Sequence, residues 1–230
     1  MSGRTRLLGP GLMTLVMLVT LIGLGTWQLQ RLRWKEDVLA RVDIAERNNP
    51  IPLPGDPQPF TKVMVEGQLR ADLAAMYGAE VRETPTGPKM GAHLIVPLER
   101  DTGNTVLVDR GWVPVTPAGP LDLPAGRVHL TGFIRPAETA GWFSATDDLA
   151  ARHFYTLNPA AIAAALRLPE AAPFILVALG EAPASRWPDP ARHLPRPPNN
   201  HLAYVVTWYG LAGTLAVIFV IWARKGSKDA

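Results

Sequence analysis

The sequence predicts a membrane-bound α+β protein, in which two antiparallel transmembrane helices flank a strand-rich extramembrane domain. Uncharged apolar segments of about a bilayer's thickness lie near both ends of the 230-residue chain. Between them, short runs of residues alternate between apolar and polar side chains, as is typical of β-strands. We expect the domain to be a small antiparallel barrel or sandwich with one short helix.

The two apolar segments cover residues 7–27 and 201–223. Each has about 20 residues, which at a rise of ~1.5 Å per residue spans the ~30 Å hydrocarbon core. The first segment also fits a secretory signal, because Arg4 and Arg6 precede it. It ends in GTWQLQRL without a small-residue cleavage pattern, which favours an uncleaved anchor. Only six residues precede it, too few for a mitochondrial transit peptide, so we expect a bacterial protein.

Charge gives limited information about orientation, because basic residues flank both spans on both sides. The terminal cations, Arg4, Arg6, Arg224, Lys225 and Lys228, favour cytoplasmic tails. The loop between the spans is then periplasmic, and we expect a protein of the bacterial inner membrane. The predicted organisation is a tail over 1–6, a span over 7–27, a helical extension and proline-rich linker over 28–59, a periplasmic β-rich domain over 60–182, a second proline-rich linker over 183–200, a span over 201–223 and a tail over 224–230.

The central domain contains six strand-like runs and one helix signal. Asn158 can cap a helix whose first turn accommodates Pro159, and AAIAAALRL continues it. The turn signal RDTGN joins two of the runs into a hairpin. The runs are KVMVEGQL, AHLIVPLE, NTVLVDRGWVPV, RVHLTGFI, HFYTL and PFILVALG.

Composition excludes several classes of function. There are 23 basic and 20 acidic residues, a formal net charge of +3, and no basic patch with interleaved aromatics, so no nucleic-acid partner is expected. The chain has no cysteine, which excludes disulfides, cysteine-ligated zinc and thiol redox chemistry. The domain's four histidines, which lack zinc-like spacing, are expected to be surface or strand residues: His93, His129, His153 and His193.

The domain also lacks a catalytic motif, and no enzyme activity is expected. Asp109 and Arg110 are interpreted as a local ion pair rather than an acid–base pair. Asp147 and Asp148 are interpreted as the start of a turn rather than a carboxylate pair.

The facing ends of the two spans hold the more informative residues. His201, Tyr204 and Trp208 share one face of the second helix, and Trp27 and Arg31 share a face of the first. Antiparallel spans bring these ends, and Gln28 with them, into the same leaflet. Four glycines are expected to allow close approach of the helices: Gly23, Gly25, Gly210 and Gly213.

Two interpretations of this cluster stay open. Aromatic residues populate most membrane interfaces, and a histidine at a helix start can act as a cap or contact lipid headgroups. Alternatively, His201 is an axial haem ligand, the aromatic rings are the walls of the haem pocket and Arg31 pairs with the propionates. Ionisable groups at membrane depth favour a functional reading.

Several segments resemble the Surfeit-locus family of cytochrome c oxidase assembly proteins over essentially the whole chain. The distinctive ones lie in the same order as in that family. They are LGTWQLQRLRWKEDVLAR, GPKMGAHLIVPLE, VLVDRGWVP and NNHLAYVVTWYGLA, with weaker support from GFIRPAETAGWF and RHFYTLN.

The resemblance implies a two-span protein whose loop lies outside the plasma membrane and which helps to build cytochrome c oxidase subunit I. It implies binding of haem a delivered by haem a synthase, with His201 as the iron ligand and Trp208 as a pocket wall. The roles of Tyr204, Trp27 and Arg31 in haem binding are inferred from helix geometry. The alternative is a scaffold that binds no haem and stabilises an assembly intermediate of subunit I.

Overall fold

The computed structural model describes residues 3–117, 119–183, 187–196 and 198–226. Parts of the predicted tails, residues 1–2 and 227–230 with Lys228, lie outside the described residues, as do residues 184–186 and 197 of the second predicted linker. The chain divides into two compact units. The helix pair comprises Met1–Asp43 and Arg196–Ala230, and the barrel domain comprises Ile44–Pro195.

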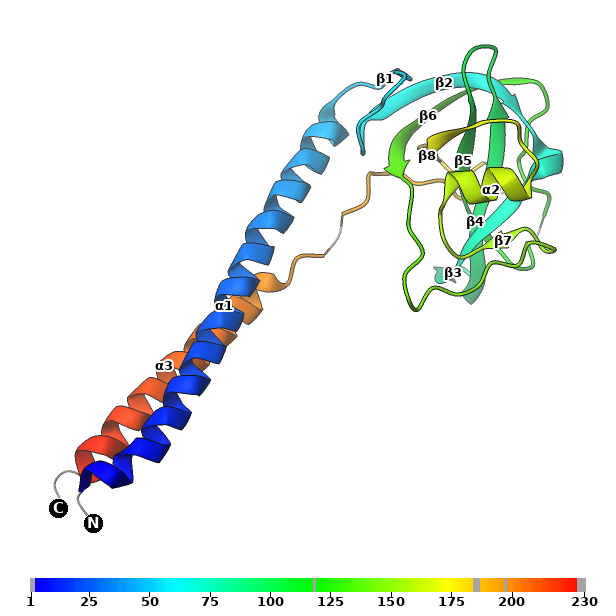
Figure 1. Ribbon diagram of the computed structural model, residues 1–230. Helices are drawn as coiled ribbons and strands as arrows, with labels where there is room; N and C mark the ends of the chain where they lie inside the picture. The colour runs from blue at the N-terminus through cyan, green and yellow to red at the C-terminus, as the bar shows by residue number, and fades with distance from the viewer. Residues whose placement is uncertain (1–2, 118, 184–186, 197, 227–230) are drawn as a thin grey trace. The chain divides into compact units, whose positions relative to one another are not determined.

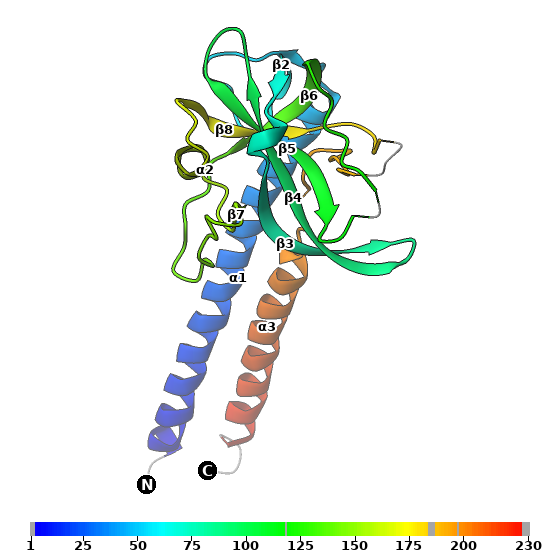
Figure 2. The same ribbon diagram turned by 90° about the vertical axis from the view of Figure 1, so that its right-hand side faces the viewer.

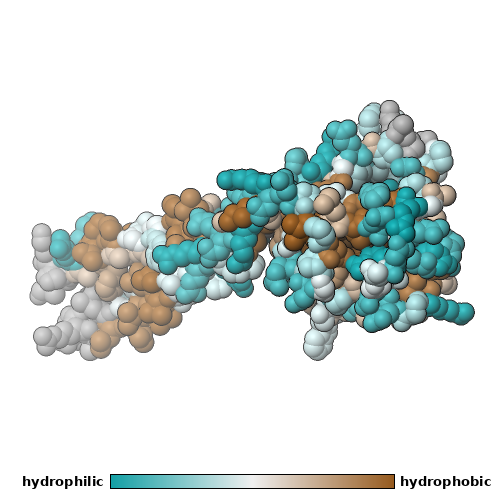
Figure 3. Space-filling view, turned by 90° about the horizontal axis from the view of Figure 1, so that it is seen from above, coloured by the Kyte–Doolittle hydropathy of each residue, from teal (hydrophilic) through white to brown (hydrophobic). Residues whose placement is uncertain are grey.

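The helix pair consists of α1 (Gly3–Arg47), whose last turn belongs to the barrel domain, and α3 (His201–Gly226). The two helices run antiparallel, so the start of α1 and the end of α3 lie at the same end of the pair (Figures 1 and 2). Both contain apolar stretches long enough to cross a bilayer, and brown apolar side chains are prominent on them in the space-filling view (Figure 3). These two candidate spans support a membrane protein.

The described residues of the barrel domain form eight strands and two short helices. The first helical segment after α1 is the single turn η1 (Ala71–Leu73), and α2 (Pro159–Ala165) precedes the last strand. The strands are β1 (Ile51–Pro52), β2 (Lys62–Leu69), β3 (Ala75–Thr84), β4 (Gly87–Glu99), β5 (Thr105–Pro114), β6 (Arg127–Pro136), β7 (His153–Phe154) and β8 (Ala171–Ala178). All six predicted runs are therefore strands, although HFYTL contributes only the two residues of β7.

Five strands close into a barrel, which decides between the predicted barrel and sandwich. The pairing order is β2–β6–β8–β5–β4, and β4 returns to β2 through Gln68 opposite Glu99 and Leu69 opposite Leu98. Taken in chain order as strands 1 to 5, they follow the ring order 1-2-3-5-4 of a five-stranded Greek-key barrel of the OB type. The remaining strands extend this ring at its edges.

The prediction of an antiparallel barrel is wrong for one pair of the closed ring, because β5 and β8 pair in parallel; outside the ring, β1 and β7 also pair in parallel with β2 and β3. Closure explains the difference. Strand direction cannot alternate all the way around a ring with an odd number of strands, so a closed five-stranded barrel needs at least one parallel pair. A parallel pair requires a long crossover, and the segment containing β6, β7 and α2 provides it.

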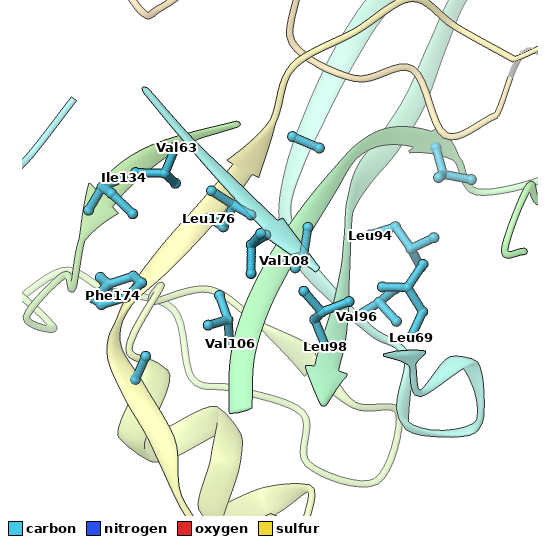
Figure 4. Packing of buried hydrophobic residues seen from close by; sticks show 14 residues of the cluster. Val63, Leu69, Leu94, Val96, Leu98, Val106, Val108, Ile134, Phe174 and Leu176 are labelled. Atoms are coloured by element: carbon cyan, nitrogen blue, oxygen red, sulfur yellow. The ribbon is translucent and has the colours of Figure 1, made fainter. Parts of the chain in front are cut away.

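The barrel interior is filled by alternate residues of each strand (Figure 4). Val63 and Val65 of β2 point inward, as their spacing predicts, and β4, β5, β6 and β8 contribute the other buried side chains. Most of these side chains are aliphatic and fully buried. They include Leu94, Val96, Leu98, Val106, Val108, Ile134 and Leu176.

A second buried cluster covers the outer face of β4, β5 and β8. Ile95, Leu107 and Ile175 point outward from these strands and pack with Ile162 and Leu166 from α2 and its C-cap. The predicted cap is confirmed: Asn158 Oδ1 accepts a hydrogen bond from the backbone N–H of Ala161 (3.1 Å), and Pro159 occupies the first helical position. Burial on both faces explains why these strands read as nearly continuous apolar runs.

The sequence did not predict strand β3, which pairs along β4. Its sequence, AMYGAEVRET, contains a β-bulge between Tyr77 and Glu80, and Gly78 within it has a φ of +71°. The bulge interrupts the alternation between the two faces, which removes the period-2 signal on which strand prediction depends.

The predicted ion pair between Asp109 and Arg110 is also wrong. Adjacent residues of a strand point to opposite faces. The buried Asp109 carboxylate therefore meets His93 across the sheet, with His93 Nδ1 2.9 Å from Oδ2 and 3.0 Å from Oδ1. Asp109 Oδ1 also accepts a hydrogen bond from the backbone N–H of Gly111 (2.9 Å). Arg110 donates instead to the carbonyl of Asp122 (3.4 Å).

We expect the His93–Asp109 pair to make the domain's stability depend on pH. Burial acts to lower the pKa of His93, but the hydrogen bond and charge of Asp109 outweigh it, and the pKa of His93 is raised. A raised folded-state pKa contributes stability below the unfolded value near 6.5, and this contribution is lost as pH rises through the folded value. Urea unfolding should therefore give a lower free energy at pH 8.5 than at pH 6.

The matched variant is His93→Gln, which cannot titrate. The decrease between pH 6 and pH 8.5 should be smaller in this variant than in the parent. An identical pH dependence of the two proteins would contradict this role of His93.

Candidate functional site

A continuous seam joins α1 and α3. The less exposed residues of each helix recur every three or four positions, the pattern of antiparallel helices that pack along their length. On α1 they include Gly11, Thr14, Leu18, Leu21, Gly25, Gln28 and Leu32. On α3 they include His201, Val205, Trp208, Ala212, Leu215 and Phe219.

Close approach within the seam depends on Gly25. It is buried, and a Cβ atom at this position would lie 3.1 Å from the ring of Tyr209. The Tyr209 hydroxyl is in turn 3.1 Å from Thr26 Oγ1. Gly25 therefore has the predicted packing role. Gly23, Gly210 and Gly213 do not, because nothing lies within 4 Å of a Cβ added at any of them.

His201 is the first residue of α3 and reaches across the seam to Gln28. Its Nδ1 is 2.7 Å from Gln28 Oε1. A carboxamide oxygen can only accept, so Nδ1 carries the donated hydrogen. In the neutral ring, this tautomer leaves the lone pair of Nε2 available. The approach of Gln28 to His201 follows from the predicted antiparallel arrangement.

Two polar atoms near His201 in the chain are buried and have no hydrogen-bond partner among the described residues. They are the indole N–H of Trp208 and the side-chain oxygen of Asn199. Buried polar atoms are normally paired, so each such atom needs an explanation. An unpaired donor and an unpaired acceptor at this end of the helix pair are consistent with a ligand that has polar groups.

The other predicted site residues are more exposed than His201. Trp27 and Tyr204 are about half exposed. Arg31 stacks between the rings of Trp27 and Trp34 on its own helix, with its guanidinium carbon 5.9 and 5.6 Å from the ring centroids. The residue of α1 that hydrogen-bonds to His201 is therefore Gln28.

Sequence reasoning missed the contribution of Tyr209 to the seam. Its neighbour Trp208 was placed on the His201 face, seven residues along the helix. Tyr209 lies about 100° around the helix from Trp208, and its ring packs against Gly25 of α1. The pair of a small residue on one helix and an aromatic residue on the other is the signal that could have identified it.

The residues at this end fit a haem ligand. A ligating histidine ordinarily donates its second ring nitrogen to an oxygen acceptor, which fixes the tautomer and the ring orientation. His201 makes this contact through Nδ1, so Nε2 is the ring nitrogen that could face a ligand. The unpaired indole N–H of Trp208 offers a donor beside an apolar ring. In the described part of the chain, the His201 end included, no cluster of three or more His, Cys, Asp or Glu residues could hold a metal ion.

Together, the fold and this site define a class: a membrane protein in which two antiparallel apolar helices bracket a five-stranded barrel domain in the sequence. The sequence model of the SURF1 family matches residues 15–213, which include most of α1, the first half of α3 and the entire barrel domain. The chain belongs to the SURF1 family.

Named relatives come from bacteria and eukaryotes. The chain is 30% identical over 228 residues to Surfeit locus protein 1 of Homo sapiens, covering 90% of this chain and 74% of the human protein. It is 30% identical over 227 residues to a SURF1-like protein of Rickettsia felis, covering 93% and 96% of the two chains. A SURF1-like protein of Monosiga brevicollis is 29% identical over 227 residues, covering 91% and 86%.

Proposed function

We propose that this chain is an assembly factor for haem–copper cytochrome c oxidase that binds haem, specifically haem a, and aids its insertion into subunit I. The single observation that carries the haem proposal is the hydrogen bond between His201 Nδ1 and Gln28 Oε1, which orients a ring whose Nε2 is available to iron. Membership of the SURF1 family supports the assembly role.

The residues of the candidate site divide the work of haem binding in this proposal. His201 would supply a nitrogen ligand to the iron, and Gln28 holds the tautomer and ring orientation of that imidazole. Trp208 and Tyr204 provide aromatic surface on α3. Trp27 and Arg31 lie on α1, where the guanidinium offers a positive charge to the propionates. Haem, when bound, supplies the iron centre needed by the oxidase, and the chain itself makes and breaks no covalent bond. It is therefore a haem-binding chaperone rather than an enzyme.

The proposed setting is the bacterial inner membrane, with both termini cytoplasmic and the barrel domain periplasmic. The two candidate spans and the cationic residues at the chain ends support this arrangement. Haem a synthase is the proposed donor and oxidase subunit I the proposed acceptor.

The test is the visible spectrum of the detergent-purified full chain from cells that make haem a. The parent protein should show a Soret band, and His201→Ala should lose at least about tenfold in bound haem. Gln28→Leu should lower haem affinity by about 10–100-fold, the usual cost of removing a partner that orients a metal ligand. His129→Ala is the matched control, because His129 is an exposed histidine of the barrel domain, and it should retain the parent spectrum.

Two results would contradict the haem proposal: a parent protein without a Soret band, or unchanged haem content in His201→Ala. If subunit I still co-purified equally with both proteins, the scaffold alternative would be favoured. In that case His201 would contribute to helix packing alone.

A further inference from the structure

The connection between β6 and β7 presents two aromatic rings to solvent. Trp142 is 97% exposed and Phe143 is 99% exposed, the highest values among the large hydrophobic residues of the described chain. Together they expose about 300–500 Å² of aromatic surface. A patch of that size matches the largest apolar patch of a typical monomer, which is often a functional surface.

The backbone of this connection is arranged to display the rings. Ser144 N–H donates to the carbonyl of Gly141 (3.1 Å), and Gly141 N–H donates to Ser144 Oγ (2.8 Å). These bonds close a four-residue turn with Trp142 and Phe143 at its two central positions. Turns favour Gly, Pro, Asn, Asp or Ser there. Two large aromatic residues give the turn no local stability, so their presence points to a contact outside this domain.

The base of the turn is acidic. Residues 139–146 carry no charge, and Asp147 and Asp148 follow directly. Asp147 Oδ1 accepts the N–H of Tyr155 (2.7 Å), and Asp148 Oδ1 accepts the N–H of Ala151 (3.0 Å). Neither carboxylate forms an ion pair with a described residue, and both lie within about 20 Å of Phe143 by chain length. The exposed rings are thus bordered by two uncompensated negative charges.

We propose that this turn is a docking element for a protein partner. Trp142 and Phe143 fill an apolar pocket, and Asp147 and Asp148 face lysine or arginine residues at its rim. Resting on the proposed assembly function, the inference identifies the partner as oxidase subunit I in its assembly intermediate.

Charge decides between a protein partner and a lipid surface. Elements that insert aromatic residues into bilayers typically carry lysine and arginine beside them, whereas the nearest charges after this turn are acidic.

The position of the turn in the fold agrees with a binding role. The turn lies between the fourth and fifth barrel strands (Figure 1), and in OB-type barrels this connection is one of the loops that contact ligands.

The test is recovery of subunit I with the tagged full chain, purified from cells that assemble the oxidase. Trp142→Ala/Phe143→Ala should lower the recovered subunit I at least about tenfold, because buried aromatic anchors commonly dominate an interface. The haem content of the purified chain should stay at the parent level. Val81→Ala/Val115→Ala is the matched control, since it removes exposed apolar side chains from another part of the domain.

A second pair of variants tests the acidic rim. Asp147→Asn/Asp148→Asn keeps both side-chain acceptors of the turn and removes both charges. It should lower recovery at low salt and make it less sensitive to added salt. A photoreactive phenylalanine analogue at position 143 should form an adduct with subunit I.

The outcomes separate this inference from the proposed function. Equal recovery of subunit I by the parent and the Trp142/Phe143 variant overturns the docking element and leaves the assembly role standing. An adduct with lipid alone overturns the protein partner in favour of a bilayer contact. Failure of every form to recover subunit I overturns both the partner and the assembly role, while a retained Soret band would preserve the assignment of His201.

Discussion

Replacing Trp112 by alanine should lower the free energy of unfolding of the barrel domain by about 3–5 kcal/mol. The Trp112 side chain is only 1% exposed, and its indole N–H donates to the carbonyl of Glu80 (3.2 Å). The guanidinium carbon of Arg82 lies over the indole, 5.5 Å from the ring centroid. The ring of Trp187 packs against Trp112 in a T-shaped arrangement, with 5.2 Å between the ring centroids. Truncation therefore removes buried apolar surface, a hydrogen bond and the ring contact with Trp187.

Urea unfolding followed by proteolysis should show this loss as a midpoint about 1–3 M lower than in the parent. Trp142→Ala is the matched control, because it deletes the same side chain from a 97% exposed position. Its free energy of unfolding should lie within about 0.5 kcal/mol of the parent value. Equal effects of the two substitutions would contradict the described burial of Trp112.

The second large effect is expected from Gly25→Leu, which should separate α1 from α3. A Cβ atom at Gly25 would already lie 3.1 Å from the Tyr209 ring, and leucine adds three more carbons beyond it. The helices must move apart or Tyr209 must rotate away from Thr26. Either change disturbs the seam that holds Gln28 beside His201, so we expect bound haem to fall at least about tenfold, as for removal of an orienting partner.

Because the chain has no cysteine, the separation can be measured by cross-linking two introduced thiols. Gly11→Cys and Phe219→Cys place them at a second contact of the seam, where a Cβ added at Gly11 lies 3.6 Å from the Phe219 ring. Gly25→Leu should slow cross-linking by a short bifunctional reagent. Gly23→Leu, on the open side of α1, should leave both cross-linking and haem content unchanged. Equal behaviour of the two leucine variants would show that Gly25 is not a packing contact.

Much of this fold is predictable because it depends on local periodicity. The strand β2 has alternating buried positions that match Val63 and Val65, and the Asn158–Pro159 pair specifies the start of α2. Barrel closure and the parallel β5–β8 pair depend instead on contacts between segments far apart in the chain. Local pattern carries no information about which strands become neighbours, so the sequence left barrel and sandwich undecided.

The candidate site was predictable to a similar extent. Helical spacing and antiparallel topology bring His201 and Gln28 to the same end of the helix pair. The rotation of each helix about its own axis was not predictable, because α1 is apolar around most of its circumference within the span. That rotation selects Gln28 and Gly25 for the seam and leaves Trp27 half-exposed.

The central claim is that the imidazole of His201 is an iron ligand, and ligand replacement tests it most directly. The measurement is the visible spectrum of His201→Gly, purified in detergent and mixed with haem a, before and after addition of free imidazole. The proposed role predicts a weak or absent Soret band in His201→Gly, which free imidazole restores to the position seen in the parent. A His201→Gly spectrum that matches the parent without imidazole would contradict the claim.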